Sequence, residues 1–149
     1  MKNIVLIGMR GTGKSRIGEN LAEKLNIKFV DLDKEIEKEE KLSIPQIVEK
    51  HGWEYFREKE SKVTEKIAKH DNAVISTGRG IILNKNNIES LKEKGVIVLL
   101  HANIETLKKR IAIDKNRPSL TGTSHTDELE EVWEERKDKY YEAADIVID

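Results

Sequence analysis

Residues 8–15 read Gly-Met-Arg-Gly-Thr-Gly-Lys-Ser, which fits the phosphate-binding pattern G-x-x-x-x-G-K-[ST]. Gly8 and Gly13 allow a tight turn that points several backbone N–H groups at one place. A helix behind this loop adds a partial positive charge at its N-terminus. Lys14 can reach the β- and γ-phosphates of a nucleotide, and Ser15 can ligate Mg²⁺. We therefore expect nucleotide contacts at Gly11, Thr12, Gly13, Lys14, Ser15 and Arg16.

Two acidic residues, Asp31 and Asp33, follow a second short apolar run. If a strand continues through both, its period of two turns the carboxylates to the same side. One carboxylate could then hold Mg²⁺, directly or through water, and the other could accept the proton of an attacking hydroxyl. The alternative is that both residues are turn or cap acids that open the next helix.

Several arginines could bind anions. Arg57 and Glu60 lie three residues apart on an expected helix, where the arginine could hold a carboxylate bidentately and the glutamate could orient it. A surface salt bridge is the alternative, and it applies equally to Arg110, Arg117 and Arg136. Arg117 differs in context because it lies in a polar loop that could close over a transferring phosphoryl group.

Apolar runs and amphipathic segments alternate along the chain, which favours a parallel sheet with helices on both faces. We expect strands at residues 3–7, 28–31, 73–76, 96–100 and 145–148. We expect helices at residues 16–25, 35–40, 53–69, 86–94, 104–113 and 129–143, with a further short one capped by Ser43. In the first helix, Ile17, Leu21 and Leu25 mark the face expected to be buried.

The predicted topology gathers the polar residues at one edge. Ligands of such sheets bind at the carboxyl ends of the strands. The glycine-rich loop, the two acids and Gly78-Arg79-Gly80 each follow a predicted strand. Residues far apart in sequence should therefore share one cleft within a single domain, residues 1–149.

The amino-acid composition argues against some classes of binding partner. The chain of 149 residues has 27 Lys and Arg against 28 Asp and Glu, a net charge of −1, which gives no support for a nucleic-acid surface. It has no cysteine, so disulfides are excluded. No apolar stretch approaches the ~20 residues of a membrane span, and the N-terminus enters a strand without a signal peptide. We expect a cytoplasmic protein without a membrane partner.

Read together, these segments resemble the shikimate kinase family of P-loop kinases over nearly the whole chain. The phosphate-binding loop is shared by many families, so the resemblance depends on the segments that follow it. These are Phe29-Val30-Asp31-Leu32-Asp33, Ile36-Glu37, Ser43-Ile44, Gly52, Phe56-Arg57-x-x-Glu60, Arg117-Pro118-x-Leu120, Arg136-x-x-x-Tyr140 and Ala144-Asp145.

The resemblance implies a three-layer α/β/α fold whose five-stranded parallel sheet has the order 2-3-1-4-5, with a lid loop at about residues 114–125. It implies a Mg²⁺-dependent enzyme of aromatic amino acid biosynthesis that converts ATP and shikimate to ADP and 3-phosphoshikimate. A monomer or weak homodimer is expected.

The resemblance also implies roles around the nucleotide. Lys14 would neutralise phosphate charge, Ser15 would bind Mg²⁺, and Asp31 would hold the metal through water. Arg117 would reach the phosphates from the lid, and Arg110 would stack near the adenine.

Further roles concern the second substrate. Asp33 would contact the ring hydroxyls and act as the base toward the 3-hydroxyl. Arg57 and Arg136 would clamp the carboxylate, and Glu60 would orient Arg57. Gly78 and Gly80 would line the substrate pocket with their backbone. Arg79 between them departs from the family pattern, and it could point away, add a cation for an acidic substrate or block shikimate.

The chain departs from the family pattern at three places. Arg79 replaces the middle glycine of the usual Gly-Gly-Gly, and Ser119 replaces a leucine of the lid. Relatives usually continue beyond strand five into a last helix, which we expect this chain to lack. Two alternatives stay open: a kinase of another hydroxy acid such as gluconate, and a non-catalytic nucleotide-binding module.

Overall fold

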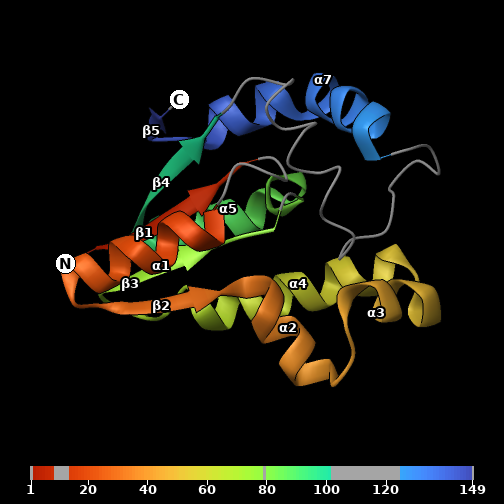
Figure 1. Ribbon diagram of the computed structural model, residues 1–149, viewed down its shortest axis with the longest axis horizontal. Helices are drawn as coiled ribbons and strands as arrows, with labels where there is room; N and C mark the ends of the chain where they lie inside the picture. Colours follow the sequence, from red (N-terminus) through yellow and green to blue (C-terminus); the bar gives the residue numbers. More distant parts are fainter. Residues whose placement is uncertain (1, 9–13, 79, 102–124, 149) are drawn as a thin grey trace.

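The protein folds as a parallel sheet with helices on both faces (Figure 1), in a computed structural model that describes residues 2–8, 14–78, 80–101 and 125–148. The strands are β1 (Asn3–Ile7), β2 (Lys28–Asp31), β3 (Ala73–Ser76), β4 (Gly95–Leu100) and β5 (Ile146–Ile148). The helices are α1 (Lys14–Leu25), α2 (Leu32–Glu40), α3 (Ile44–His51), α4 (Trp53–Ile67), α5 (Lys85–Lys94) and α7 (His125–Ala143), with a 3₁₀ turn, η1 (Ile81–Leu83).

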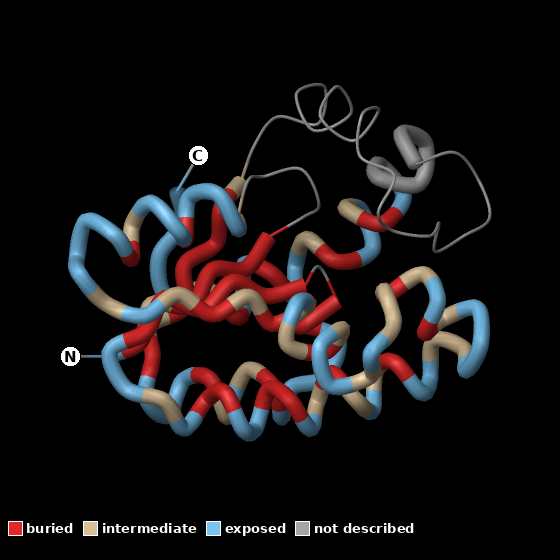
Figure 2. Tube along the Cα trace, turned by 60° about the horizontal axis from the view of Figure 1, so that its bottom comes forward, coloured by how far each residue is buried: buried red, intermediate tan, exposed pale blue. Residues whose placement is uncertain are grey.

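The strand order is β2-β3-β1-β4-β5, and every pairing is parallel. This confirms the predicted fold class and strand order. The central strand β1 pairs with β3 and β4, so that Val5 lies between Ile75 and Ile97. All three side chains are fully buried, as expected for strands covered on both faces. Figure 2 shows this buried sheet between the helical layers.

One face of the sheet is covered by α1, and the predicted packing is wrong for two of its three residues, since Leu21 alone packs against the core. The expected core residues Ile17 and Leu25 are each 43% exposed, whereas Gly18 and Ala22 face the sheet. A Cβ at Gly18 would lie 2.6 Å from the Phe29 ring. The small residues let the helix approach the strands closely, which outweighs the apolar spacing on its other side.

The opposite face carries α4 and α5, and it holds the larger part of the core. The predicted inward residues of α4, which are Phe56, Val63 and Ile67, are all buried. Helices α2 and α3 pack against α4 (Figure 1). Ser43 caps α3 as predicted: its hydroxyl accepts from the Gln46 N–H, and the Gln46 side chain accepts from the Ser43 N–H.

Two helices begin at other residues than predicted, and two predicted segments lie outside the residues that the structure describes. Helix α1 begins at Lys14, and α7 begins at His125, inside the segment expected to be a loop. The helix expected at residues 104–113 and the lid expected from residue 114 lie outside the described residues. Among the helices that the structure describes, none combines the length and low polarity needed to cross a membrane.

Candidate active site

The phosphate-binding loop leaves the carboxyl end of β1 and enters α1. Gly8 is buried with φ 150°, a conformation suited to glycine, and the Lys14 Nζ donates to its carbonyl at 2.7 Å. Lys14 is half-buried in the first turn of α1, and Arg16 follows it in an exposed position. The loop between Gly8 and Lys14, which includes Gly11, Thr12 and Gly13, lies outside the described residues.

Three oxygen-bearing side chains meet beside this loop. The Ser15 Oγ donates to Asp31 Oδ2 at 2.9 Å and lies 3.5 Å from Ser76 Oγ. These residues come from α1 and from the carboxyl ends of β2 and β3, which are adjacent strands. Hydroxyl and carboxylate oxygens suit Mg²⁺, which takes few protein ligands and completes its shell with phosphate and water. Over the described ranges, no group of three or more acidic or histidine side chains offers a closed metal cage.

Asp31 and Asp33 do not share a strand, so the predicted alternation does not apply. Strand β2 ends at Asp31, which is the N-cap of α2 and accepts from the Lys34 N–H at 3.3 Å. The cap alternative is therefore correct for Asp31, and it is compatible with a metal role because the other oxygen faces Ser15. Asp33 lies in the first turn of α2, where its Oδ1 is closed off from solvent.

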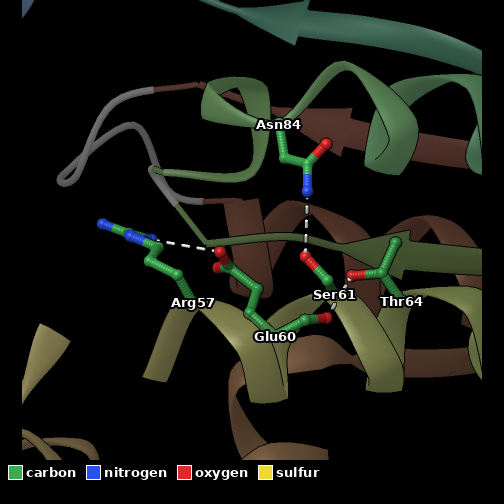
Figure 3. Close-up of polar contacts among 5 residues, drawn as sticks. All are labelled: Arg57, Glu60, Ser61, Thr64 and Asn84. Atoms are coloured by element: carbon green, nitrogen blue, oxygen red, sulfur yellow. Dashed lines mark hydrogen bonds and ion pairs between the residues drawn. The ribbon is translucent and has the colours of Figure 1, made fainter. Parts of the chain in front are cut away.

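Arg57 and Glu60 form the predicted pair on α4. The Arg57 Nη1 lies 3.1 Å from Glu60 Oε1, with side-chain exposures of 23% and 1% (Figure 3). The burial of Glu60 separates this pair from the surface salt bridge of the alternative interpretation. The Arg57 guanidinium also lies over two rings, 5.2 Å from the centroid of Trp53 and 5.4 Å from that of Phe56.

Because Gly80 has no side chain, the Arg57 guanidinium can occupy the space beside it. A Cβ built there would lie within 2.5 Å of three guanidinium atoms. Gly80 is buried just after β3, with φ −97°, so its backbone does not need glycine. Glycine is needed at this position because any side chain would overlap the Arg57 guanidinium. Gly78 is buried on the same loop, and its carbonyl accepts from the Ile81 N–H at 3.2 Å. Arg79, between them, lies outside the described residues.

A second guanidinium approaches from α7. Arg136 is 9% exposed, and burial lowers the pKa of its guanidinium. The Tyr140 side chain raises that pKa, the nearby Arg57 charge lowers it, and the Glu60 charge raises it. The charges of Arg57 and Glu60 thus both act on the pKa of Arg136, and two guanidinium groups against one carboxylate leave a net positive charge that favours an incoming anion. The remaining predicted arginines, Arg110 and Arg117, lie outside the described residues.

An open groove of about 750 Å³ lies beside this pair, lined by Arg57, Glu60 and Gly80. Its lining includes Ser61 of α4 and Asn84, the N-cap of α5, whose Nδ2 donates to Ser61 Oγ at 3.3 Å (Figure 3). Arg57 and Glu60 therefore border an open polar groove, whose lining does not include Asp33 or Arg136.

Sequence reasoning missed two contacts. Ser76 stands beside Ser15, and its signal was a polar residue that ends an otherwise apolar strand. The Tyr140 hydroxyl donates to the Gly8 carbonyl at 3.3 Å, across 132 positions of sequence, and no local pattern signals that contact.

Comparisons with known proteins fit this geometry. The profile of the family described as "Shikimate kinase" matches residues 10–149. This chain belongs to the shikimate kinase family. A shikimate kinase from Caldanaerobacter subterraneus subsp. tengcongensis is 43% identical over 149 residues, which is 100% of this chain and 86% of the relative.

Solved structures of the family agree with the fold. Shikimate kinase from Acinetobacter baumannii in complex with shikimate superimposes with a TM-score of 0.95 at 36% identity, over 100% of this chain and 83% of that one. A gluconokinase from Sinorhizobium meliloti reaches a TM-score of 0.51 at 18% identity, over 89% of this chain and 73% of that one, which shows a related fold alone. As a member of the shikimate kinase family, the chain is a kinase.

Proposed function

We propose that this chain transfers the γ-phosphoryl group of ATP to the 3-hydroxyl of shikimate and releases ADP and 3-phosphoshikimate. Family membership supports the overall reaction. The observation that carries the assignment of residues is geometric. Arg57 pairs with the buried Glu60 and lies against Gly80, just after β3, while α7 carries Arg136 one turn before Tyr140. The Tyr140 hydroxyl contacts the Gly8 carbonyl to which Lys14 also donates. One end of this site suits a carboxylate and the other suits phosphates.

The arginine end would bind the substrate carboxylate. Arg57 is held by Glu60 and by the rings beneath it, so its guanidinium is fixed before the substrate arrives. Such fixed donors hold a planar carboxylate bidentately at little entropic cost. Arg136 would supply the second cation, with Gly78, Arg79 and Gly80 lining the pocket.

The loop end would bind ATP. Lys14 would leave the Gly8 carbonyl and pair with the β- and γ-phosphates, and the backbone of Gly11, Thr12 and Gly13 would donate to them. Arg16 is included in this nucleotide site, as are Arg110 near the adenine and Arg117 on the phosphates. Ser15 and Asp31 fit Mg²⁺, which supplies charge neutralisation of the phosphates when bound.

The transfer itself needs little covalent help from the protein. Asp33 would accept the proton of the 3-hydroxyl while the bond between that oxygen and the γ-phosphorus forms. The bond from the γ-phosphorus to the β–γ bridging oxygen breaks, and ADP leaves with the electron pair. Asp33 lies two residues after Asp31 along the chain but in the helix, so the proton acceptor and the metal ligand come from different elements.

We propose further that the protein acts in the cytoplasm, where ATP and Mg²⁺ are available, as a monomer or weak homodimer without nucleic-acid or membrane partners. A single domain spanning residues 1–149 stays a prediction.

ADP release coupled to NADH oxidation, measured with shikimate, gluconate or no acceptor, tests the function. We expect turnover that depends on shikimate, and a product with one added phosphoryl group by mass spectrometry. The Lys14→Ala variant should lose most of this turnover and keep its unfolding temperature. Turnover with gluconate but not shikimate would establish the other kinase, and nucleotide binding without acceptor-dependent turnover would establish the binding module.

A further inference from the structure

Tyr140 connects the last long helix to the phosphate-binding loop. Its side chain is fully buried on α7, and its ring stacks on Trp133 with centroids 6.1 Å apart. The hydroxyl donates to the carbonyl of Gly8, the first residue of the loop, at 3.3 Å. Gly8 is itself buried, so this carbonyl depends on protein donors.

The same carbonyl accepts from Lys14, whose Nζ lies 2.7 Å away. Under the proposed function, Lys14 must turn from this carbonyl to the phosphates when ATP binds. A buried carbonyl that loses a donor costs free energy, and that cost is subtracted from the affinity for the nucleotide. A second donor that stayed in place, such as the Tyr140 hydroxyl, would reduce this cost.

Tyr140 also stands one helical turn after Arg136, at i+4 on the same face of α7. Both side chains are buried, and Tyr140 raises the pKa of the Arg136 guanidinium. One turn of helix therefore contacts the nucleotide loop through Tyr140 and supplies the carboxylate clamp through Arg136.

We propose that Tyr140 is a positioning residue for the nucleotide: its hydroxyl holds the Gly8 carbonyl and so frees Lys14 to bind the phosphates. This inference rests on the proposed function, and it adds a residue of α7 to the nucleotide site. The role is distinct from catalysis, because the hydroxyl acts through Gly8 and Lys14.

The test compares Tyr140→Phe with Tyr141→Phe in the full chain. The first substitution keeps the aromatic ring and its packing and removes only the hydroxyl, while Tyr141 is the adjacent tyrosine, 46% exposed. By titration calorimetry with MgATP, we expect Tyr140→Phe to weaken binding about tenfold, and Tyr141→Phe to leave it within about twofold of wild type. Shikimate binding without nucleotide should be equal in both variants.

A double-mutant cycle with Lys14→Ala separates positioning from a general structural role. Without the Lys14 amine, no donor leaves the Gly8 carbonyl on binding, so Tyr140→Phe should no longer affect ATP affinity. Equal ATP affinity of the two tyrosine variants would overturn the inference, as would an undiminished effect in the Lys14→Ala background. A wild-type chain that binds ATP but does not phosphorylate shikimate would contradict the proposed function alone, because the binding comparison does not need turnover.

Discussion

Gly80→Ala is the sharpest perturbation of the proposed carboxylate clamp. The new methyl group would lie within 2.5 Å of three atoms of the Arg57 guanidinium, whereas ordinary contact begins at 3.4 Å. The guanidinium must then move by roughly 1 Å or more, which breaks its alignment with Glu60 and with a bound carboxylate. A hydrogen bond to a charged group contributes about 1.5–3 kcal/mol, so the KM for shikimate should rise about 10- to 100-fold.

The same substitution should leave the fold intact. The atom that has to move is the end of a long side chain that is 23% exposed, and φ of −97° at residue 80 is accessible to alanine. We expect the unfolding temperature, followed by circular dichroism, to stay within about 4 °C of wild type, which corresponds to less than about 1 kcal/mol. The KM for ATP should be unchanged.

Gly95→Ala is the matched control. Its Cβ would lie 2.8 Å from the Leu91 carbonyl oxygen and 3.2 Å from that of Asn3, both backbone atoms that cannot swing aside. Gly95 is the first residue of β4 and so lies at the amino ends of the strands, whereas the candidate site lies at their carboxyl ends. This variant should lose about 1–3 kcal/mol of stability and keep the KM for shikimate. A Gly80→Ala variant with a wild-type KM, or with a stability loss like that of Gly95→Ala, would refute the reasoning.

The remaining predictions concern the acids. Asp31→Asn should keep the α2 cap, because asparagine caps as well as aspartate, but raise the Mg²⁺ concentration for half-maximal rate roughly 10- to 100-fold; a shifted unfolding temperature with normal Mg²⁺ dependence would contradict this. Asp33→Asn should lower kcat about 10²- to 10⁴-fold with little change in ATP affinity, and an equal loss of ATP affinity in calorimetry would instead place Asp33 in the metal site. Glu60→Gln should raise the KM for shikimate about tenfold, because Glu60 aligns Arg57, whereas the exposed neighbour variant Glu58→Gln should match wild type; equal KM values for the two variants would show that Glu60 does not orient the clamp.

Sequence predicted those features that follow from local pattern and topology. The phosphate-binding loop has a fixed spacing, and alternating strands and helices require that β1, β2 and β3 bring their carboxyl ends together. The pairing of Arg57 with Glu60 followed from their spacing on one helix face. The burial of Glu60 could not be predicted from that spacing, because it depends on the elements packed around α4.

Two kinds of feature could not be predicted: packing that depends on the absent side chain of a glycine, and contacts between residues far apart in the sequence. The buried face of α1 is set by Gly18, where the absence of a side chain admits Phe29, while apolar spacing pointed to Ile17 and Leu25. Helix α2 begins one residue after Asp31, so Asp31 caps this helix and the strand does not continue to Asp33. The hydrogen bond between Tyr140 and Gly8 joins the two ends of the chain, and only the folded arrangement reveals it.

The charges of the site explain how two anionic substrates can meet without repelling each other. Their anionic groups would occupy separate cation sites, phosphates at the loop with Lys14 and the carboxylate between Arg57 and Arg136. The buried carboxylate of Glu60 lies on the arginine side, where it limits the mutual repulsion of the two guanidinium groups before the substrate binds. In this proposal, cations at both ends would leave the middle of the site for the alcohol and Asp33. Positioning of this kind is the main contribution a protein makes to phosphoryl transfer, and here it comes from fixed helices and strand ends.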